Sequence, residues 1–141
     1  MGTRIEDVKK MHHHRALVTG AGSAKGIGFA CARALGQSGM AVEIVSTTDR
    51  IYDRVVELAM EGIIARGHVT DLTDPVAVAA LVGACDGPLD VLVNNAGMGS
   101  IVAPSVSRAF VDQSPADWTR ALEVNLNERR TYYPCLSSWH D

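Results

Sequence analysis

The sequence has little cysteine, little net charge and no long hydrophobic run. Its three cysteines lie far apart and show no Cys-x-x-Cys spacing, so neither a disulfide framework nor a zinc site is indicated. The formal net charge is -3, without a long block of one sign, which argues against a surface for nucleic acid or anionic membrane. The longest nearly apolar run, residues 76–85, is too short to cross a bilayer. These absences predict a protein of the reducing cytoplasm.

The first residues lack the apolar core of a secretory signal. They lead into His12, His13 and His14, whose imidazoles could bind a transition metal. Consecutive side chains of a strand point to alternate faces, so we interpret this run as a solvated segment. We expect residues 1–14 to form a flexible N-terminal segment, and the remaining length, at 47% hydrophobic residues overall, to form one domain with a sizeable core.

Short apolar runs bounded by turn residues predict four strands, at residues 15–19, 41–46, 63–70 and 89–94. A helical pattern follows each of the first two strands. The residues expected on one helical face are Ile27, Ala30, Cys31, Ala34 and Leu35 in the first helix, and Ile51, Val55, Leu58 and Ala59 in the second, which begins at about residue 50.

Capping residues mark two further helix starts. Asp74 is placed as an N-cap before Pro75 at the first helical position, and the resulting helix is expected to break within residues 83–88. Residues 114–117, Ser-Pro-Ala-Asp, form a capping box that opens a last helix. The first of these helices carries Val76, Ala79 and Ala80, and the second carries Trp118, Leu122, Val124 and Asn125.

Strands that alternate with helices at this spacing pair in parallel through right-handed crossovers. The sequence therefore predicts an α/β fold with a doubly wound parallel sheet that stops after about four strands. Ligands of such sheets bind beyond the carboxyl ends of the strands, where the strand order reverses. Candidate motifs follow all four strand ends, at residues 20–28, at Thr47, at Asp71 and at residues 94–97, and we expect them to meet on one rim.

The loop at residues 19–28, Thr-Gly-Ala-Gly-Ser-Ala-Lys-Gly-Ile-Gly, joins the first strand to a helix. Glycines in this place permit a tight turn, bring the backbone close to a dinucleotide pyrophosphate and let the helix pack against the strand. The helix N-terminus offers unpaired N–H groups and the positive end of its dipole to the anion. The loop therefore predicts a dinucleotide site.

Residues 94–97, Asn-Asn-Ala-Gly, directly follow the apolar run 89–93. This turn, with the glycine loop, resembles the short-chain dehydrogenase/reductase family, nicotinamide-dependent oxidoreductases on a single Rossmann domain, and the resemblance covers about residues 16–126. In the family the turn stabilises the central sheet and lines the cofactor site. The family spacing is Thr-Gly, three residues, then Gly-x-Gly, and this loop departs from it. Two registers are open. Gly20 pairs either with Gly26-Ile27-Gly28, in a loop two residues longer, or with Ala24-Lys25-Gly26, at the same length but with alanine in place of a glycine. We prefer the first, because Ile27 begins the apolar pattern of the helix.

The resemblance also implies roles at the other strand ends. Asp71-Leu72 is similar to the family's adenine-binding aspartate, although Asp71 could instead cap a helix, a place that Asp74 fills better. Thr47 and Thr48 stand where an acidic residue would select NAD, and Lys25 and Arg50 could pair with a 2′-phosphate, so we expect NADP rather than NAD, despite Asp49. The expected cofactor-binding residues are Gly20, Ser23, Lys25, Gly26, Ile27, Gly28, Thr47, Thr48, Arg50, Asp71, Leu72, Asn94, Asn95, Ala96 and Gly97.

Reduction by this family uses a tyrosine acid, a lysine, a serine and an asparagine that anchors a proton-relay water. Asn125 matches the asparagine, while a helix-surface amide is its alternative interpretation. The lysines are Lys9, Lys10 and Lys25 alone, so no Tyr-x-x-x-Lys occurs. Tyr132, Tyr133, Ser137 and Ser138 are not assigned a catalytic role, because the first two have no following lysine and the serines lack a strand to aim them.

The helical pattern breaks at residues 127–130, Asn-Glu-Arg-Arg, and then at Pro134. We hypothesise that residues 127–141 are a tail produced by a frameshift or a truncated reading frame, after a dinucleotide-binding portion at residues 15–126. The expected function is a carbonyl or secondary-alcohol oxidoreductase, including 3-oxoacyl thioester reduction, inactive as this chain alone. The alternative is a non-catalytic dinucleotide-binding module. The expected partners are a small-molecule substrate and, as the family suggests, a second copy of the chain, although the helix that the family packs between subunits is disrupted here. Neither nucleic acid nor membrane is expected.

Overall fold

The structure, a computed structural model, describes residues 14–85, 87–97, 114–122 and 125. Its elements, in chain order, are β1 (Arg15–Thr19), α2 (Ile27–Gln37), β2 (Ala41–Ser46), α3 (Arg50–Met60), β3 (Ala65–Val69), α4 (Pro75–Ala84), β4 (Val91–Val93) and α5 (Pro115–Leu122). All four predicted strands are present, the third and fourth shorter than expected. The predicted tail at residues 127–141 and all but the last residue of the N-terminal segment lie outside the described residues.

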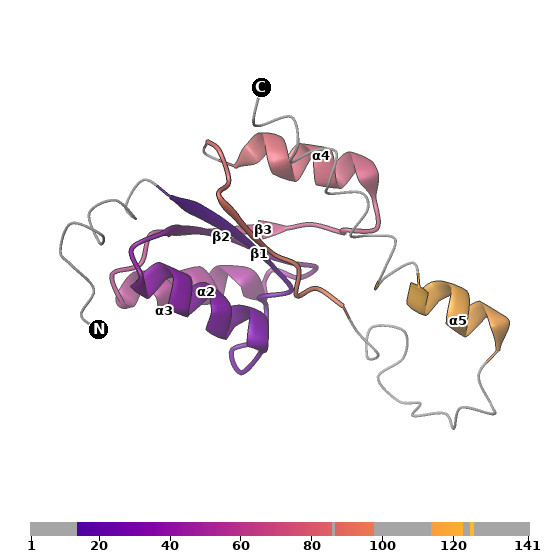
Figure 1. The fold of residues 1–141 in the computed structure, drawn as a ribbon. Coiled ribbons are helices and arrows are strands. Elements are labelled where there is room, and N and C mark those ends of the chain that lie inside the picture. Colours follow the sequence, from indigo (N-terminus) through magenta and orange to yellow (C-terminus); the bar gives the residue numbers. More distant parts are fainter. Residues whose placement is uncertain (1–13, 86, 98–113, 123–124, 126–141) are drawn as a thin grey trace, which may run out of the picture.

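The four strands form one parallel sheet in the order β3-β2-β1-β4 (Figure 1). Val18 of β1 is paired with Ile44 of β2 on one side and with Val93 of β4 on the other. The chain first adds strands on one side of β1 and then crosses to the other side. This reversal makes the carboxyl ends of β1 and β4 the switch point, and it confirms the predicted doubly wound α/β fold.

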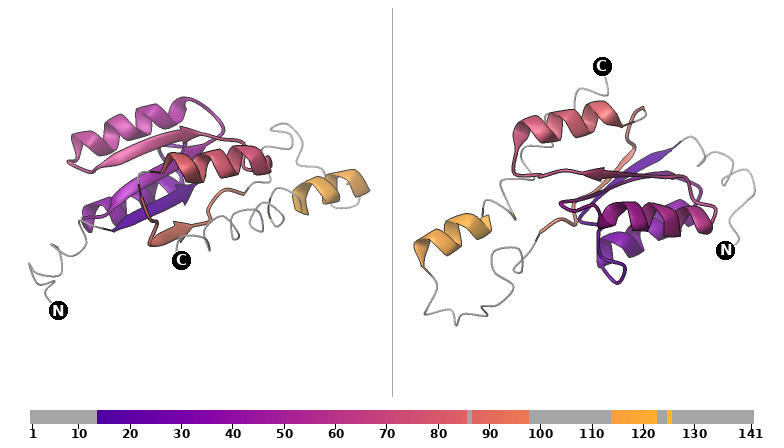
Figure 2. Two further views of the ribbon diagram at one scale, coloured as in Figure 1. Left: turned by 90° about the horizontal axis from the view of Figure 1, so that it is seen from above. Right: turned by 180° about the vertical axis from the view of Figure 1, so that it is seen from behind.

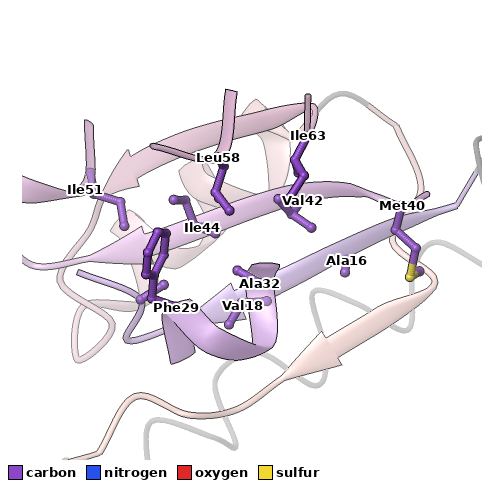
Figure 3. Packing of buried hydrophobic residues seen from close by; sticks show 11 residues of the cluster. Ala16, Val18, Phe29, Ala32, Met40, Val42, Ile44, Ile51, Leu58 and Ile63 are labelled. Carbon is purple, nitrogen blue, oxygen red and sulfur yellow. The ribbon is translucent and has the colours of Figure 1, made fainter. Parts of the chain in front are cut away.

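Helices cover both faces of the sheet, with α2 and α3 on one face and α4 on the other (Figures 1 and 2). Alternate residues of the strands point to opposite faces. On the α2 and α3 side, the buried cluster drawn in Figure 3 consists of Ala16, Val18, Ala21, Phe29, Ala32, Met40, Val42, Ile44, Ile51, Leu58 and Ile63. On the α4 side, a smaller buried cluster consists of Leu17, Val45, Leu72, Val78 and Leu81.

The predicted core face of α2 is wrong. Ile27 is 76% exposed, Ala30 and Ala34 are exposed as well, and the fully buried positions are Gly28, Phe29 and Ala32. The cause is the contact between Gly28 and the turn after β1, which directs that face of the helix toward the sheet. Cys31 and Leu35 remain half-buried against the same cluster. Ile27 is left at the helix start, beside the carboxyl ends of the strands.

The buried residues of α3 differ from the expected ones at one position, and those of α4 differ at all three. In α3, Ile51 and Leu58 are buried as expected and Val55 packs against the core, but Ala59 is exposed. In α4, the three residues named from the sequence, Val76, Ala79 and Ala80, are all exposed, and Val78, Leu81 and Val82 are buried instead. Because α4 is apolar on every side, its sequence does not specify which face meets the sheet.

The helix starts agree with the capping residues. The Asp74 carboxylate accepts a hydrogen bond from the Val76 N–H at 2.9 Å, ahead of Pro75 at the helix start. In α5, the Asp117 N–H donates to Ser114 Oγ at 3.2 Å and Asp117 Oδ2 accepts from the Ser114 N–H at 2.8 Å, which is a reciprocal capping box. Trp118 and Leu122 of α5 are exposed, and Val124 lies outside the described residues. In the described part of the chain, every helix is too short or too polar to span a membrane.

Candidate functional site

A cleft of about 370 Å³ opens at the carboxyl ends of the strands. It lies at the switch point between β1 and β4, where the topology predicts a ligand. Segments from all four strand ends meet in its wall, as the sequence predicted for the rim. The lining residues are Gly20, Gly22, Ser23, Gly26, Ile27, Ser46, Thr47, Thr48, Arg50, Thr70, Leu72, Asn95, Ala96 and Gly97.

The glycine loop brings backbone directly to the cleft. Gly20 has a φ of +69°, in the left-handed region that favours glycine, so the chain turns sharply after β1. A Cβ atom on Gly28 would lie 2.6 Å from the Gly20 carbonyl oxygen, so α2 approaches the turn closely only because the side chain is missing. These contacts fit the register that pairs Gly20 with Gly26-Ile27-Gly28. Because α2 has no side-chain cap at Gly26, its first-turn N–H groups are left to solvent or an anionic ligand.

Asn95 fastens the turn after β4 to the turn after β1. Its side-chain Nδ2 donates hydrogen bonds to the carbonyl oxygens of Thr19 and Gly20, both at 3.1 Å. The Thr19 hydroxyl in return accepts from the backbone N–H groups of Asn95, at 3.1 Å, and of Ala96, at 2.9 Å. Thr19 is buried, and these bonds satisfy polar groups at the strand ends that would otherwise lack partners. These bonds therefore tie together two of the turns that line the cleft.

The end of β2 forms the wall that faces the helix start. Ser46 Oγ donates to the Thr48 carbonyl oxygen at 2.7 Å and accepts from the Thr48 N–H at 3.1 Å, which closes a tight turn. Arg50 Nε donates to Thr48 Oγ1 at 3.3 Å, so the guanidinium lies on this wall together with Thr47 and Thr48. Lys25 is exposed in the glycine loop and does not line the cleft.

Asp71 follows β3 but does not line the cleft, although its neighbours Thr70 and Leu72 do. Its Oδ1 accepts hydrogen bonds from the Thr73 hydroxyl, at 2.6 Å, and from the Thr73 N–H, at 2.9 Å. These two bonds hold the pKa of the Asp71 carboxyl below its usual value. Asp74 caps α4, so the alternative interpretation of Asp71 as the cap of this helix is wrong.

Two asparagines next to the cleft have different surroundings. Asn94 does not line the cleft wall, and its Oδ1 is buried without a hydrogen-bond partner among the described residues. A buried acceptor without a partner is uncommon. Asn125 lies against the same turn, since a Cβ atom on Gly97 would be 2.8 Å from Asn125 Oδ1. The tyrosines and serines considered near the end of the chain lie outside the described residues.

Besides Asn125, which does not line the cleft wall, the structure leaves four of the predicted cofactor-binding residues out of it and brings the others together. Those four are Lys25, Gly28, Asp71 and Asn94. Sequence reasoning in turn missed three lining residues, Gly22, Ser46 and Thr70. Gly22 lies within the glycine loop, and the other two stand directly at strand ends, so the rule that ligands bind at the carboxyl ends of strands could have found all three.

Residues 14–128 match the family model for the short chain dehydrogenases. Galactitol 2-dehydrogenase of Rhizobium johnstonii is 35% identical over 121 residues, which cover 84% of this chain and 44% of the relative. Cis-4-hydroxycyclohexanecarboxylate dehydrogenase of Sinomonas cyclohexanicum is 40% identical over 79% of this chain and 43% of its own length. The chain thus spans less than half the length of these curated relatives.

Solved structures show the same likeness. An actinorhodin polyketide ketoreductase variant with NADPH has a TM-score of 0.76 and 32% identity, covering 87% of this chain and 46% of that chain. A metagenomic short-chain oxidoreductase in complex with NADP has a TM-score of 0.75 and 32% identity, covering 89% and 55%. Together with the sheet order, the glycine loop and the Asn-Asn-Ala-Gly turn, the match over residues 14–128 shows that this chain belongs to the short-chain dehydrogenase family.

Proposed function

We propose that the cleft binds a nicotinamide dinucleotide and prefers NADP(H) over NAD(H). The observation that carries this proposal is the meeting, in one cleft, of the glycine loop, the uncapped start of α2 and the Arg50 guanidinium. The loop and the helix start suit a pyrophosphate, because both offer backbone N–H groups and close approach. Two similar structures hold NADPH and NADP, which supports the same cofactor class here.

The preference for the phosphorylated cofactor rests on the end of β2. Thr47, Thr48 and Arg50 line the cleft there, and among the residues that the structure describes no acidic side chain lines it. A carboxylate at this point would bind the ribose hydroxyls of NAD and repel a 2′-phosphate, whereas a guanidinium pairs with phosphate oxygens. Lys25 is exposed in the glycine loop, between the cleft-lining residues Ser23 and Gly26, and we propose it as a second cation for the phosphate.

The residues at the other two strand ends suit the remaining parts of such a cofactor. We assign the adenine end to the segment Thr70–Leu72, in which Leu72 is buried and lines the cleft. Asp71 would contribute its carboxylate, which Thr73 already orients. The nicotinamide end is assigned to the turn at residues 94–97, whose Asn95, Ala96 and Gly97 line the cleft.

The reaction class that fits this site is the interconversion of a carbonyl and a secondary alcohol, including 3-oxoacyl thioesters. When bound, the dinucleotide would supply or accept the hydride. We propose that Asn125, which lies against Gly97, holds a water for proton relay, and its closeness to the turn after β4 supports this role. The 141 residues contain no Tyr-x-x-x-Lys, so we propose that this chain by itself binds the cofactor without turning over substrate.

Calorimetric titration of the 141-residue chain with NADPH and with NADH tests binding and preference. We expect saturable binding that is tighter for NADPH. Incubation with NADPH and a panel of ketones, aldehydes and 3-oxoacyl thioesters, followed at the NADPH absorbance, should show no turnover. Turnover would contradict the inactive assignment and support a complete enzyme. Failure of both cofactors to bind, by titration and by thermal shift, would contradict the proposed site.

A non-catalytic binding module is the second candidate function, because the cleft by itself accounts for cofactor binding. Binding with no turnover in the chain alone fits both candidates, so the source DNA distinguishes them. We propose that residues 127–141 are a tail from a shifted reading frame, and the family match ends close by, at residue 128. A serine and a Tyr-x-x-x-Lys in another frame downstream would support the oxidoreductase. If no frame restores them, the module is favoured.

We also propose a cytoplasmic location, a small-molecule carbonyl or alcohol as the partner, and self-association of the completed domain. Residues beyond Leu126 break the helical pattern that relatives use between subunits, so the 141-residue chain should associate weakly. Light scattering after size exclusion measures this directly, and a stable dimer or tetramer of the chain would contradict it.

A further inference from the structure

A second group of chemically active side chains lies away from the cleft, on the α4 side of the sheet. Glu43 points to this face from the middle of β2 and is 0% exposed. Its Oε1 accepts from Arg15 Nη1 of β1 at 2.5 Å, and its Oε2 lies 2.7 Å from His68 Nε2 of β3. Cys85, which follows the last residue of α4, is half-buried beside them. The ligand atoms of Glu43, His68 and Cys85 all lie within 4.8 Å of one another.

Sheet register explains how these residues meet. Glu43 is paired with Leu17 of β1 and with Arg66 of β3, and His68 is paired with Val45. Paired residues of parallel strands point to the same face, and Leu17 and Val45 belong to the buried cluster under α4. These polar residues therefore lie on the same face of the sheet as the buried cluster under α4. None of its members lines the dinucleotide cleft, so the cofactor site does not account for it.

A buried carboxylate in an otherwise apolar strand is costly and needs a compensating partner. Arg15 and His68 supply hydrogen bonds, but they do not explain a thiol at the same place. A carboxylate, an imidazole and a thiol together form the donor set that borderline ions such as Zn²⁺ favour over Mg²⁺ or Ca²⁺. We propose that Glu43, His68 and Cys85 form a binding site for a zinc-class divalent cation that links β2, β3 and the end of α4.

The protons balance without any change of oxidation state. The Cys85 thiol, which now donates to the Leu81 carbonyl oxygen at 3.3 Å, releases its proton to solvent as its sulfur binds the ion. His68 binds through Nε2, so the Nε2 proton that points to Glu43 Oε2 before the ion binds leaves to solvent, and the neutral ring holds its one proton on Nδ1. Zinc takes nitrogen and oxygen ligands at about 2.0–2.1 Å, so the 2.7 Å contact between His68 and Glu43 must open by roughly half an ångström.

The surroundings set the expected pH dependence. Burial, together with the Glu43 charge, raises the pKa of the Cys85 thiol to about 11, against smaller opposing effects of Arg15 and Arg66. The ion must therefore compete with a proton on sulfur, and affinity should rise with pH. Arg15 keeps its bond to Glu43 Oε1 and orients the carboxylate. Both arginine charges oppose a cation, so the site should be weaker than a four-cysteine zinc site.

Cobalt is the probe for this site, because a thiolate ligand gives Co²⁺ an intense charge-transfer band in the near ultraviolet. Titration of the full 141-residue chain should produce this band at one equivalent. Cys85→Ser should abolish it, whereas the matched variants Cys31→Ser and Cys135→Ser should keep it. His12, His13 and His14 can also bind cobalt, but a site without sulfur gives no such band. Absence of the band, or a band that survives Cys85→Ser, would overturn the proposal.

A second variant keeps the test valid if Cys85→Ser fails to fold. His68→Gln retains an N–H donor for Glu43 and removes the imidazole ligand, so it should fold and bind cobalt at least tenfold more weakly. Zn²⁺ should raise the unfolding temperature of the wild-type chain and not that of His68→Gln. Equal zinc shifts in both proteins would overturn the proposal. NADPH binding should be the same in all these variants, which separates this site from the cleft.

Discussion

The side-chain amide of Asn95 donates to the carbonyl oxygens of both Thr19 and Gly20, while the Thr19 hydroxyl accepts from the Asn95 backbone N–H. This reciprocal contact joins residues that lie 76 positions apart in the chain. It fixes the ends of β1 and β4 relative to each other at the switch point. The cleft keeps its shape because these two strand ends cannot separate without leaving buried polar groups unsatisfied.

Asn95→Ala should lower the free energy of unfolding by about 2 kcal/mol, because two carbonyl oxygens lose their donor. Asn94→Ala is the matched control. Since Asn94 Oδ1 has no partner among the described residues, its loss should change stability by only about 0.5 kcal/mol. Urea unfolding of the three proteins measures the difference, and equal destabilisation by both substitutions would contradict the assigned roles.

Gly28→Ala should destabilise the protein and weaken NADPH binding together. The new Cβ would lie 2.5 Å from Asn95 Nδ2 and 2.6 Å from the Gly20 carbonyl oxygen, so α2 must move away from the turn, at a cost of about 1–3 kcal/mol. Gly83→Ala, within α4, has no atom within 4 Å of its new Cβ and should stabilise by about 0.5–1 kcal/mol. Thermal unfolding measures the stability, and calorimetry measures NADPH binding. If both are unchanged in Gly28→Ala, the close approach of α2 to the turn after β1 is contradicted.

Arg50→Ala should weaken NADPH binding by about tenfold and leave NADH binding unchanged, because one charged hydrogen-bond partner of the 2′-phosphate is lost. Arg33→Ala serves as the control, since Arg33 pairs with Glu61 outside the cleft lining. Thr47→Asp should act in the same direction as Arg50→Ala by repelling the phosphate. Calorimetric titrations measure the affinities for NADPH and NADH. An equal loss of affinity for NADH would show that Arg50 does not bind the 2′-phosphate.

Glu43 should make the free energy of unfolding depend on pH in the acid range. Burial raises the pKa of its carboxyl, but hydrogen bonds and charges of His68 and Arg15 lower it more, and the net value lies below the ordinary 4.5. The unfolded chain therefore takes up this proton first as the pH falls. The stabilisation is complete above about pH 4.5 and is lost as the pH falls through the folded-state pKa.

Glu43→Gln should therefore lose roughly 3 kcal/mol at neutral pH, where a buried ion pair is broken, and less in acid. Glu61→Gln is the control, because Glu61 pairs with Arg33 where both side chains are about one-third exposed, and it should change stability by at most about 0.5 kcal/mol. Urea unfolding at stepwise lower pH measures both. If the difference in the free energy of unfolding between the wild type and Glu43→Gln stays constant with pH, Glu43 is not the titrating group.

The rim of the cleft was predictable because its signals are local. Gly20 and Gly28 mark a turn that only glycine permits, Asp74 and Pro75 mark a helix start, and the residues at 94–97 follow directly on an apolar strand. Each signal depends on a few neighbouring residues. The placement of Asp71 and Lys25 outside the cleft lining was not predictable, since it depends on how a loop settles after its strand ends.

By itself, the sequence determined the order of strands and helices, the doubly wound sheet and the four segments that meet at its carboxyl edge, because turn, cap and strand preferences act over short stretches. Tertiary structure alone decided which face of α2 and α4 is buried, since α4 is apolar all round and Gly28 directs α2 through a backbone contact. It also decided the meeting of Glu43, His68 and Cys85, because only strand register brings side chains from separate elements to one point.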